Sequence, residues 1–244
     1  MSSVLTANKV TKTFKQKKAL DEVSMDIKKG DIYGLIGKNG AGKTTLIRII
    51  CGLAAPTGGD IKLFDSSDLV SARKEIGTVI ESPAFYPNMT AKQNLMAQCK
   101  LMGVKNTKCI PKILHMVGLE GTDKKKAKNF SLGMKQRLAI ALSLVGEPKF
   151  LVLDEPTNGL DPEGIKEIRE LILTLNEKYE ITVLISSHIL SELSKIATRY
   201  GILHEGKLLE EFTEEDLWKK CSENQNGELD LESYFLQVIG GNRQ

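Results

Sequence analysis

Short runs of apolar residues recur along the chain and are separated by amphipathic segments. Such runs, apolar without alternation, occupy residues 32–36, 76–80, 150–153 and 181–185. Continuous apolar runs of this length are typical of strands that are buried on both faces of a parallel sheet. The segments 45–50 and 162–179 follow two of the runs at a short distance and favour helices. The order of these elements predicts an α/β fold with a mainly parallel core sheet.

The N-terminal segment differs because polar residues alternate with apolar ones. Val23, Met25 and Ile27 are separated by Ser24 and Asp26, which predicts a half-buried strand. Residues 4–14 show polar alternation as well, and we interpret them as an edge strand. The pattern therefore predicts an N-terminal antiparallel β subdomain beside the core sheet.

A long stretch between two of the core strands has helical periodicity. Thr90 and Gln93 fit a capping box that opens a helix reaching about Met102. Apolar residues continue at helical spacing to about Val145. We therefore predict a helical insert at about residues 82–145.

A glycine-rich loop follows the first core strand and has the form G-x-x-x-x-G-K-[ST]. Its glycines let successive backbone N–H groups form a positive nest, and the following helix directs its N-terminus at the same point. Lys43 is placed to reach the β- and γ-phosphates of a nucleotide, and the Thr44 hydroxyl to ligate Mg²⁺. The expected nucleotide contacts in this loop are Gly37, Lys38, Asn39, Gly40, Ala41, Gly42, Lys43, Thr44 and Thr45.

Two acids end the apolar run at 150–153. Ligands bind at the carboxyl edge of the strands in open α/β sheets, so both carboxylates are expected at the ligand. Asp154 is expected to hold Mg²⁺, directly or through water. Glu155 is then the candidate general base that orients and deprotonates an attacking water.

Four further polar or aromatic candidates lie outside these two motifs. His188 follows the run at 181–185 and should lie at the same sheet edge as Asp154. Ser131 begins a predicted helix, where an anion can bind. Asp161 precedes Pro162 as the N-cap of a helix to about Tyr179. Phe14 is suited either to stacking on an adenine base or to a half-buried strand.

Composition excludes several classes of protein. The net charge of +3 is too small to indicate a nucleic-acid partner. No apolar run approaches the roughly 18 residues that span a bilayer, and the first residues lack the pattern of a secretory signal. The four cysteines are scattered without a C-x-x-C pair, which indicates reduced thiols rather than a zinc site or a disulfide frame.

Together the motifs resemble the ATP-binding subunit of an ABC transporter, over residues 4 to about 211. In this resemblance 37–44 is the Walker A loop, 150–155 is Walker B with its catalytic glutamate, and 158–161 is the D-loop with Asp161. The resemblance implies that His188 is the switch histidine and that Phe14 stacks on adenine. It also implies ATP and Mg²⁺ as cofactors, with Lys43, Glu155 and His188 in catalysis.

The resemblance implies a domain division as well. Residues 1–211 would form the nucleotide-binding domain, with a P-loop NTPase fold and the helical insert at about 82–145. Residues 212–244 would form a C-terminal helical extension.

The chain departs from the family pattern at two motifs. Residues 130–134 read Phe-Ser-Leu-Gly-Met where the family has Leu-Ser-Gly-Gly-Gln. Ser131 and Gly133 are kept, and the resemblance implies that they touch the γ-phosphate held by a second copy. Glu81 replaces the Q-loop glutamine. Its carboxylate is still suited to accept a bond from water or to ligate Mg²⁺, although it adds negative charge.

The segments 81–87 and 130–137 resemble a narrower group, the bacterial ATPases of lantibiotic immunity and bacitracin resistance. This implies export, or removal from the membrane, of antimicrobial peptides. The partners implied are transmembrane permease subunits and a second nucleotide-binding domain, identical or similar, with no nucleic acid. The implied location is cytoplasmic, at the inner face of the cell membrane.

Two other classes of function compete with the transporter. Soluble ABC ATPases that act on ribosomes or DNA usually carry two cassettes or a long coiled-coil insert, and neither is visible in this sequence. In a P-loop kinase of small molecules, the segments 131–137 and 158–161 would have no role.

Overall fold

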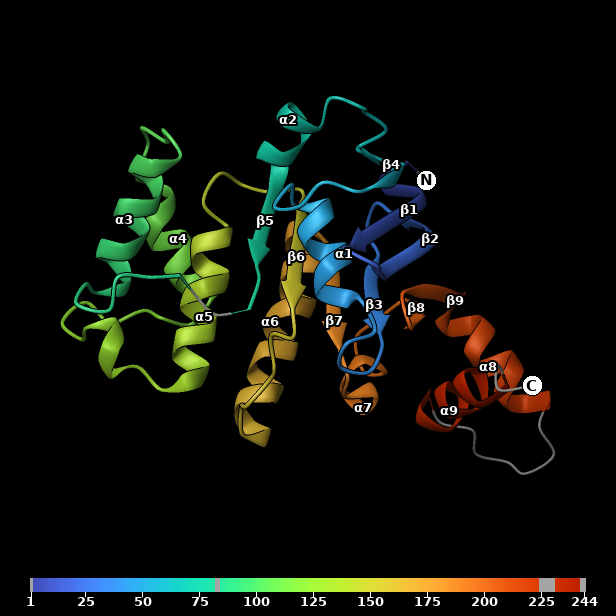
Figure 1. Ribbon diagram of the computed structural model, residues 1–244. Helices are drawn as coiled ribbons and strands as arrows, with labels where there is room; N and C mark the ends of the chain where they lie inside the picture. Colours follow the sequence, from blue (N-terminus) through green and yellow to red (C-terminus); the bar gives the residue numbers. More distant parts are fainter. Residues whose placement is uncertain (1, 82–83, 224–230, 242–244) are drawn as a thin grey trace.

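The computed structural model describes residues 2–81, 84–223 and 231–241, except for the side chains of 218 and 220–223. Two β-sheets form the centre of the molecule, and helices lie around them (Figure 1). The elements in chain order are β1 (Ser3–Phe14), β2 (Lys17–Lys28), β3 (Ile32–Ile36), α1 (Lys43–Ile50), β4 (Gly58–Leu63), α2 (Leu69–Ala72), the 3-10 helix η1 (Arg73–Glu75), β5 (Ile76–Val79), α3 (Ala91–Leu101), α4 (Cys109–Met116), the 3-10 helix η2 (Ala127–Asn129), α5 (Leu132–Ser143), β6 (Phe150–Asp154), α6 (Pro162–Tyr179), β7 (Thr182–Ser187), α7 (Leu190–Leu193), β8 (Arg199–His204), β9 (Lys207–Thr213), α8 (Glu214–Glu223) and α9 (Leu231–Gly241).

The larger sheet has the strand order β5-β6-β7-β3-β8-β9. Its strands pair in parallel except for β9, which forms an antiparallel hairpin with β8. The strands β3, β6 and β7 are buried along their whole length, as their apolar sequences predict. This arrangement confirms the predicted α/β fold with a mainly parallel core sheet.

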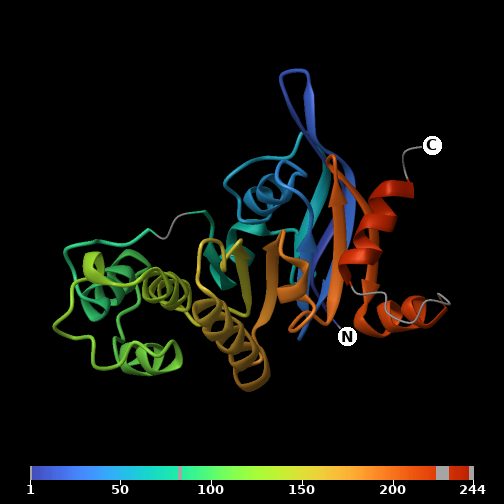
Figure 2. The same ribbon diagram turned by 90° about the horizontal axis from the view of Figure 1, so that it is seen from below.

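Successive side chains of the central strands point into two different cores. In β3, Ile32 and Ile36 belong to the core that includes α6 and the helical insert. Tyr33 and Leu35 belong to the core that includes α1 and the N-terminal sheet. The two-residue period of a strand thus fixes helices on opposite faces of the sheet, which Figure 2 shows for α1 and α6.

The smaller sheet is antiparallel, with the order β2-β1-β4. The prediction of an edge strand at residues 4–14 is wrong, because β1 is the middle strand of this sheet. Leu5 lies opposite Ile27 of β2 on one side and Leu63 of β4 on the other. The polar alternation of β1 results from its partly exposed face. It does not indicate which strands lie on either side of β1.

The helices α3, α4 and α5 lie together beside the central sheet, at the left of Figure 1. The predicted capping box is present at α3: the Gln93 N–H donates to Thr90 Oγ1 at 3.3 Å, and the Thr90 N–H donates to Gln93 Oε1 at 2.9 Å. These helices fall within the predicted insert at about 82–145, whose boundaries remain a prediction.

The C-terminal part of the described chain consists of α8 and α9. The strand β9 continues to Thr213, and the helical part begins at Glu214. The division of the chain into domains at 211 remains a prediction. Leu231, Phe235 and Ile239 of α9 are buried, and α9 packs against α7. Residues 224–230, between the two helices, lie outside the described residues.

Candidate functional site

A cavity of about 590 Å³ lies at the carboxyl edge of the central strands, around the glycine-rich loop. Its lining contains the predicted aromatic residue, most of the predicted loop and one of the two predicted acids. The lining residues are Phe14, Lys17, Lys18, Ala19, Lys38, Asn39, Gly40, Gly42, Lys43, Thr44, Thr45, Glu155, Glu205 and Gly206. The fold therefore brings Phe14, the loop and Glu155 to one cavity, although they are far apart in the sequence.

The loop has a conformation that requires glycine at two positions. Gly42 is the N-cap of α1 and has φ = 112°, in the region that only glycine adopts readily. A Cβ atom at Gly37 would lie 2.5 Å from the carbonyl oxygen of Leu203, because β8 passes directly beside the loop. Both glycines thus allow the loop to curl tightly before α1, whose first residues then face the cavity.

Lys43 is the buried cation of the cavity, with 5% of its surface exposed. Its ammonium group donates to the carbonyl oxygen of Gly37 at 2.6 Å and lies 3.0 Å from Glu155 Oε1. These contacts hold the side chain against the loop. A buried ammonium group of this kind is suited to bind an anion that enters the loop.

Glu155 bridges two of the predicted catalytic side chains. Oε1 of Glu155 faces Lys43, and Oε2 lies 2.7 Å from Nδ1 of His188. The backbone at Glu155 has φ = 51°, which is uncommon for a residue other than glycine. Its N–H donates to the carbonyl oxygen and the hydroxyl of Ser186, at 3.2 Å and 3.0 Å. These bonds stabilise the turn that directs the carboxylate into the cavity.

Ser186 is a site residue that the sequence reasoning missed. Its hydroxyl donates to Asp154 Oδ1 at 2.6 Å and accepts the N–H of Glu155 at 3.0 Å. One buried side chain on β7 therefore orients both acids at the end of β6. The sequence feature that could have indicated Ser186 is its position at the end of an apolar run, two residues before His188. Its role also depends on β6 and β7 being neighbours, which the sequence does not state.

Asp154 and Thr44 offer oxygen atoms for a magnesium ion. Mg²⁺ prefers oxygen ligands and is commonly held by one or two carboxylates together with the phosphates of a substrate. Asp154 is 4% exposed and oriented by Ser186, and Thr44 lines the cavity. Within the described part of the chain, no group of three or more His, Cys, Asp or Glu side chains is arranged to hold a metal ion. The oxygen atoms of Asp154 and Thr44 thus fit a metal ion whose other ligands come from a bound nucleotide.

The remaining predicted residues do not line the cavity. Glu81 is exposed and forms an ion pair with Arg48 of α1, with 2.5 Å between Oε1 and Nη2. Ser131 is exposed and caps α5 by accepting the N–H of Met134 at 3.2 Å, and Gly133 is half-buried in the first turn of that helix. Asp161 caps α6 by accepting the N–H of Gly164 at 2.9 Å. Their predicted contacts with a nucleotide remain predictions.

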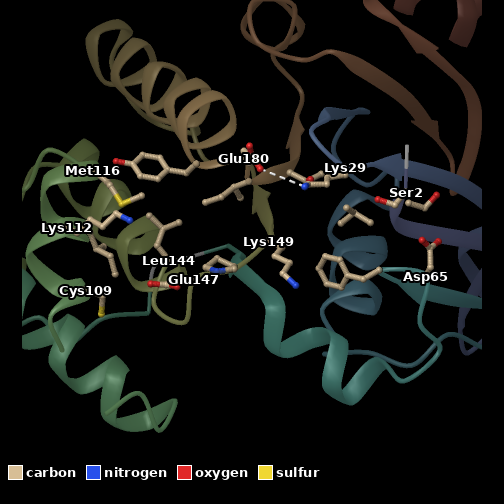
Figure 3. A pocket seen from close by; sticks show the side chains of 18 residues that line it. Ser2, Lys29, Asp65, Cys109, Lys112, Met116, Leu144, Glu147, Lys149 and Glu180 are labelled. Atoms are coloured by element: carbon tan, nitrogen blue, oxygen red, sulfur yellow. Dashed lines mark ion pairs between the residues drawn. The ribbon is translucent and has the colours of Figure 1, made fainter. Parts of the chain in front are cut away.

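A second cavity, of about 620 Å³, lies at the opposite edge of the central sheet (Figure 3). It lies between α4, which contributes Lys112 and Met116, and the two segments that contain Lys29 and Glu180. Although it is slightly larger, its lining contains no residue of the glycine-rich loop 37–45. The cavity around Lys43 is therefore the candidate site for a nucleotide.

The fold and the site define the class of protein. A glycine loop joins a parallel strand to a helix, and two acids end another strand of the same sheet, as in a P-loop nucleotide-binding protein. The sequence matches the ABC transporter family over residues 20–158, which is more than half of the chain. The chain belongs to this family, as an ATP-binding subunit.

Similar proteins support the narrower resemblance as well. The chain is 46% identical to the bacitracin transport ATP-binding protein BcrA of Bacillus licheniformis, over 90% of this chain and 73% of the relative. It is 44% identical to the lantibiotic transport ATP-binding protein SrtF of Streptococcus pyogenes, over 84% of this chain and 89% of the relative. The predicted resemblance to the lantibiotic and bacitracin group is therefore confirmed.

Solved structures agree with the fold. The cbiO1 subunit of Clostridium perfringens, part of an ABC transporter complex, superposes with a TM-score of 0.81 at 27% identity, over 90% of this chain and 92% of that chain. A dimeric ATP-binding cassette with ADP and phosphate gives a TM-score of 0.74 at 28% identity, over 86% of this chain and 98% of that chain.

None of the helices in the described residues has the length and apolar character needed to cross a bilayer.

Proposed function

We propose that this chain hydrolyses ATP and thereby powers the export, or the removal from the membrane, of an antimicrobial peptide. The observation that carries the proposal is the position of Glu155. Its carboxylate lies at the cavity of the phosphate loop, between Lys43 and His188. A carboxylate so placed is suited to act as a general base toward a water beside the terminal phosphate.

The loop and Lys43 account for the binding of the triphosphate. Backbone N–H groups and the N-terminus of α1 stabilise the phosphate charges, and Lys43 adds a buried cation. Phe14 lines the same cavity and is 52% exposed, so its ring is accessible to an adenine base. This accessibility favours base stacking over a purely structural role for Phe14.

Thr44 and Asp154 would hold Mg²⁺ together with the phosphates. When bound, the metal ion neutralises charge on the β- and γ-phosphates. The Ser186 hydroxyl holds the Asp154 carboxylate in place through its 2.6 Å bond. A metal contact from Glu81 would first require its ion pair with Arg48 to open.

Hydrolysis depends on the carboxylate of Glu155. Phosphates in the loop compete with Oε1 of Glu155 for the ammonium group of Lys43, so nucleotide binding leaves Oε1 available to a water. Oε2 stays near His188 Nδ1, which keeps the carboxylate oriented. Catalysis then consists mainly of positioning and charge stabilisation, as is general for phosphoryl transfer.

A second copy, or a similar subunit, would complete the site. Ser131 is exposed and Gly133 half-buried at the start of α5, and neither lines the cavity of its own chain. Their position leaves them available to the nucleotide of a partner, and the similar cassette with ADP and phosphate is dimeric. ATP would thus favour the dimer because it binds the closed state better than the open one.

The permease subunits would dock beside the Glu81 segment. A shallow cavity of about 310 Å³ lies there between β5, α3 and α5. Leu53 and Met102 line it with exposed fractions of 68% and 44%, which offers an apolar contact surface. Since Glu81 connects the core to the helical insert, this position suits the transmission of motion to a membrane partner. The subunit would then lie on the cytoplasmic face of the membrane.

Two measurements test the proposal. Purified protein should release phosphate from Mg-ATP without an added acceptor, whereas a small-molecule kinase requires one. A strain that lacks this gene should become more sensitive to bacitracin-like or lantibiotic peptides, and the parent gene should restore resistance. Phosphate release without any change in peptide sensitivity would retain the ATPase and reject the peptide substrate.

A further inference from the structure

The C-terminal helix α9 packs against α7, the short helix that follows His188. The chain passes from His188 through Ile189 directly into α7, which begins at Leu190. Leu190 and Leu193 of α7 are buried in the same core as the apolar face of α9. Figure 1 shows the two helices near the edge of the sheet to which the phosphate loop belongs.

The helix α9 is fixed to the sheet as well as to α7. Tyr234 packs edge-on against Phe212 of β9, with 5.3 Å between the ring centroids and 82° between the planes. Its hydroxyl lies 2.5 Å from Oε2 of Glu210 on the same strand. Leu231 and Phe235 are 3% and 4% exposed. These contacts give α9 a defined position from which it can support α7.

The other side of α7 is held by α6. Glu192 forms an ion pair with Arg169 at 2.8 Å, and both side chains are about one-fifth exposed. The turn at 187–189 is closed by the Ile189 N–H, which donates to Ser187 Oγ at 2.9 Å. The helix α7 therefore lies between α6 and α9, and the loop that bears His188 is connected to this arrangement.

The position of α7 depends on these neighbours, because it consists of four residues. A single turn has no stability of its own in water, since the nucleation of a helix is unfavourable. The burial of Leu190 and Leu193 fixes the position of α7. Loss of the α9 contact would remove one of the supports of α7 and loosen the 2.7 Å approach of His188 to Glu155.

We propose that α9 is a positioning element for His188, acting through α7, so that the C-terminal extension sets the rate of ATP hydrolysis. The inference rests on the proposed function, in which His188 orients Glu155. It assigns Leu231 a positioning role, because this side chain anchors α9 in the core shared with α7. The expected effect is on turnover and not on ATP affinity, since α9 does not line the cavity.

A matched pair of substitutions on α9 tests the proposal. Leu231→Ala removes a buried anchor, whereas Leu236→Ala makes the same change at a side chain that is 54% exposed. In the full-length protein, Leu231→Ala should lower kcat roughly tenfold, because small displacements of catalytic groups have effects of this order or larger. Its KM for ATP should stay within about twofold of the parent, and Leu236→Ala should match the parent in both.

The same substitution in a His188→Ala background separates positioning from general destabilisation. If α9 acts through His188, Leu231→Ala should lower kcat no further in that background. An equal loss in both backgrounds, or an unchanged kcat in the parent background, would overturn the inference. A parent protein without ATPase activity would instead reject the proposed function.

NMR spectroscopy of the histidines tests the proposal even where the ATPase activity is too low to compare variants. The chain has three histidines, so the imidazole NMR signals of His188 can be assigned from their absence in His188→Ala. Leu231→Ala should shift these signals and leave those of His115 in place, and unshifted His188 signals would contradict the proposal. If Leu231→Ala fails to fold, Tyr234→Phe replaces it. This variant loses the hydroxyl contact with Glu210 and should shift the same signals.

Discussion

The ammonium nitrogen of Lys43 lies 3.0 Å from Oε1 of Glu155. The cation proposed to bind the phosphates and the carboxylate proposed to activate the water thus form an ion pair with each other. In the proposed function the phosphates compete for the same ammonium group, so we expect nucleotide binding and activation of the base to be coupled through this pair. The other carboxylate oxygen lies 2.7 Å from Nδ1 of His188, so Glu155 contacts both residues at once.

Ser186→Ala should impair both acids at once. The substitution removes the hydroxyl that donates to Asp154 and accepts from the Glu155 N–H. We expect a loss of stability of about 2 kcal/mol, typical of a hydrogen bond to a charged group. We also expect a fall in kcat of roughly tenfold, from misplacement of the carboxylates. Denaturant unfolding and steady-state phosphate release measure the two effects.

Ser143→Ala is the control, because the Ser143 hydroxyl donates to the Ile140 carbonyl within its own helix, α5. It should retain the parent kcat. A Ser186→Ala protein with the parent kcat would show that the acids are positioned without this hydroxyl.

The role of Ser186 illustrates what the sequence could not provide. Lys43, Asp154 and Glu155 were predicted because each lies in a strand–loop motif that is contiguous in the sequence. Ser186 acts on β6 from β7, and only the strand order of the folded sheet makes the two strands neighbours. The same reason explains the error at β1, whose second partner β4 comes about fifty residues later in the chain.

The C-terminal extension shows the same limit. The family resemblance implies a helical extension at 212–244, and the helices α8 and α9 lie in this region. What α9 packs against was not readable, because α7 has four residues and no distinctive pattern. Packing between short elements that are far apart in the sequence depends on side-chain complementarity that periodicity does not encode.

Phe14→Ala should weaken ATP binding. The ring lines the nucleotide cavity, and Lys12 Nζ lies 5.0 Å from its centroid. Stacking of a base on an aromatic ring contributes about 1–3 kcal/mol, so the Kd for ATP should rise roughly tenfold. Phe14→Trp, which keeps an aromatic face, should retain the parent affinity in equilibrium titration. If Phe14→Ala binds ATP with the same affinity as the parent, the role of Phe14 is only structural, within the sheet.

Glu81→Gln should change coupling rather than nucleotide binding. Glu81 is exposed and paired with Arg48, and exposed pairs contribute about 1 kcal/mol or less, so stability should change little. The Kd for ATP should stay near the parent value. Peptide resistance conferred by the assembled transporter should change, because the segment joins core and insert. A large loss of ATP affinity would identify Glu81 as a direct nucleotide contact instead.

Glu211 gives the stability of the fold a specific pH dependence. Burial raises the pKa of this carboxyl above its ordinary value of 4.5, although the hydrogen bond from the Tyr33 hydroxyl, at 2.8 Å, opposes the shift. The folded protein therefore holds this proton more tightly than the unfolded chain does. The resulting contribution to stability is fully present below the ordinary pKa and is lost as the pH rises through the raised pKa.

Glu211→Gln should remove this contribution, because glutamine does not titrate but still accepts from Tyr33. The free energy of unfolding of the variant should therefore rise relative to the parent as the pH increases from about 4 through the raised pKa. Urea unfolding across this range measures the difference. Glu205→Gln, at a side chain that is 87% exposed, is the control and should show no such trend. A constant difference between Glu211→Gln and the parent would contradict the assignment.

The most direct test of the central claim is the turnover of Glu155→Gln in Mg-ATP. Glutamine keeps the size of the side chain but cannot accept the proton of the attacking water. The account predicts ATP binding close to that of the parent, a fall in kcat of at least about 100-fold, as expected for loss of a general base, and an ATP-dependent dimer that accumulates in size-exclusion chromatography. Parental turnover in this variant would contradict the account, because Glu155 would then not be the base.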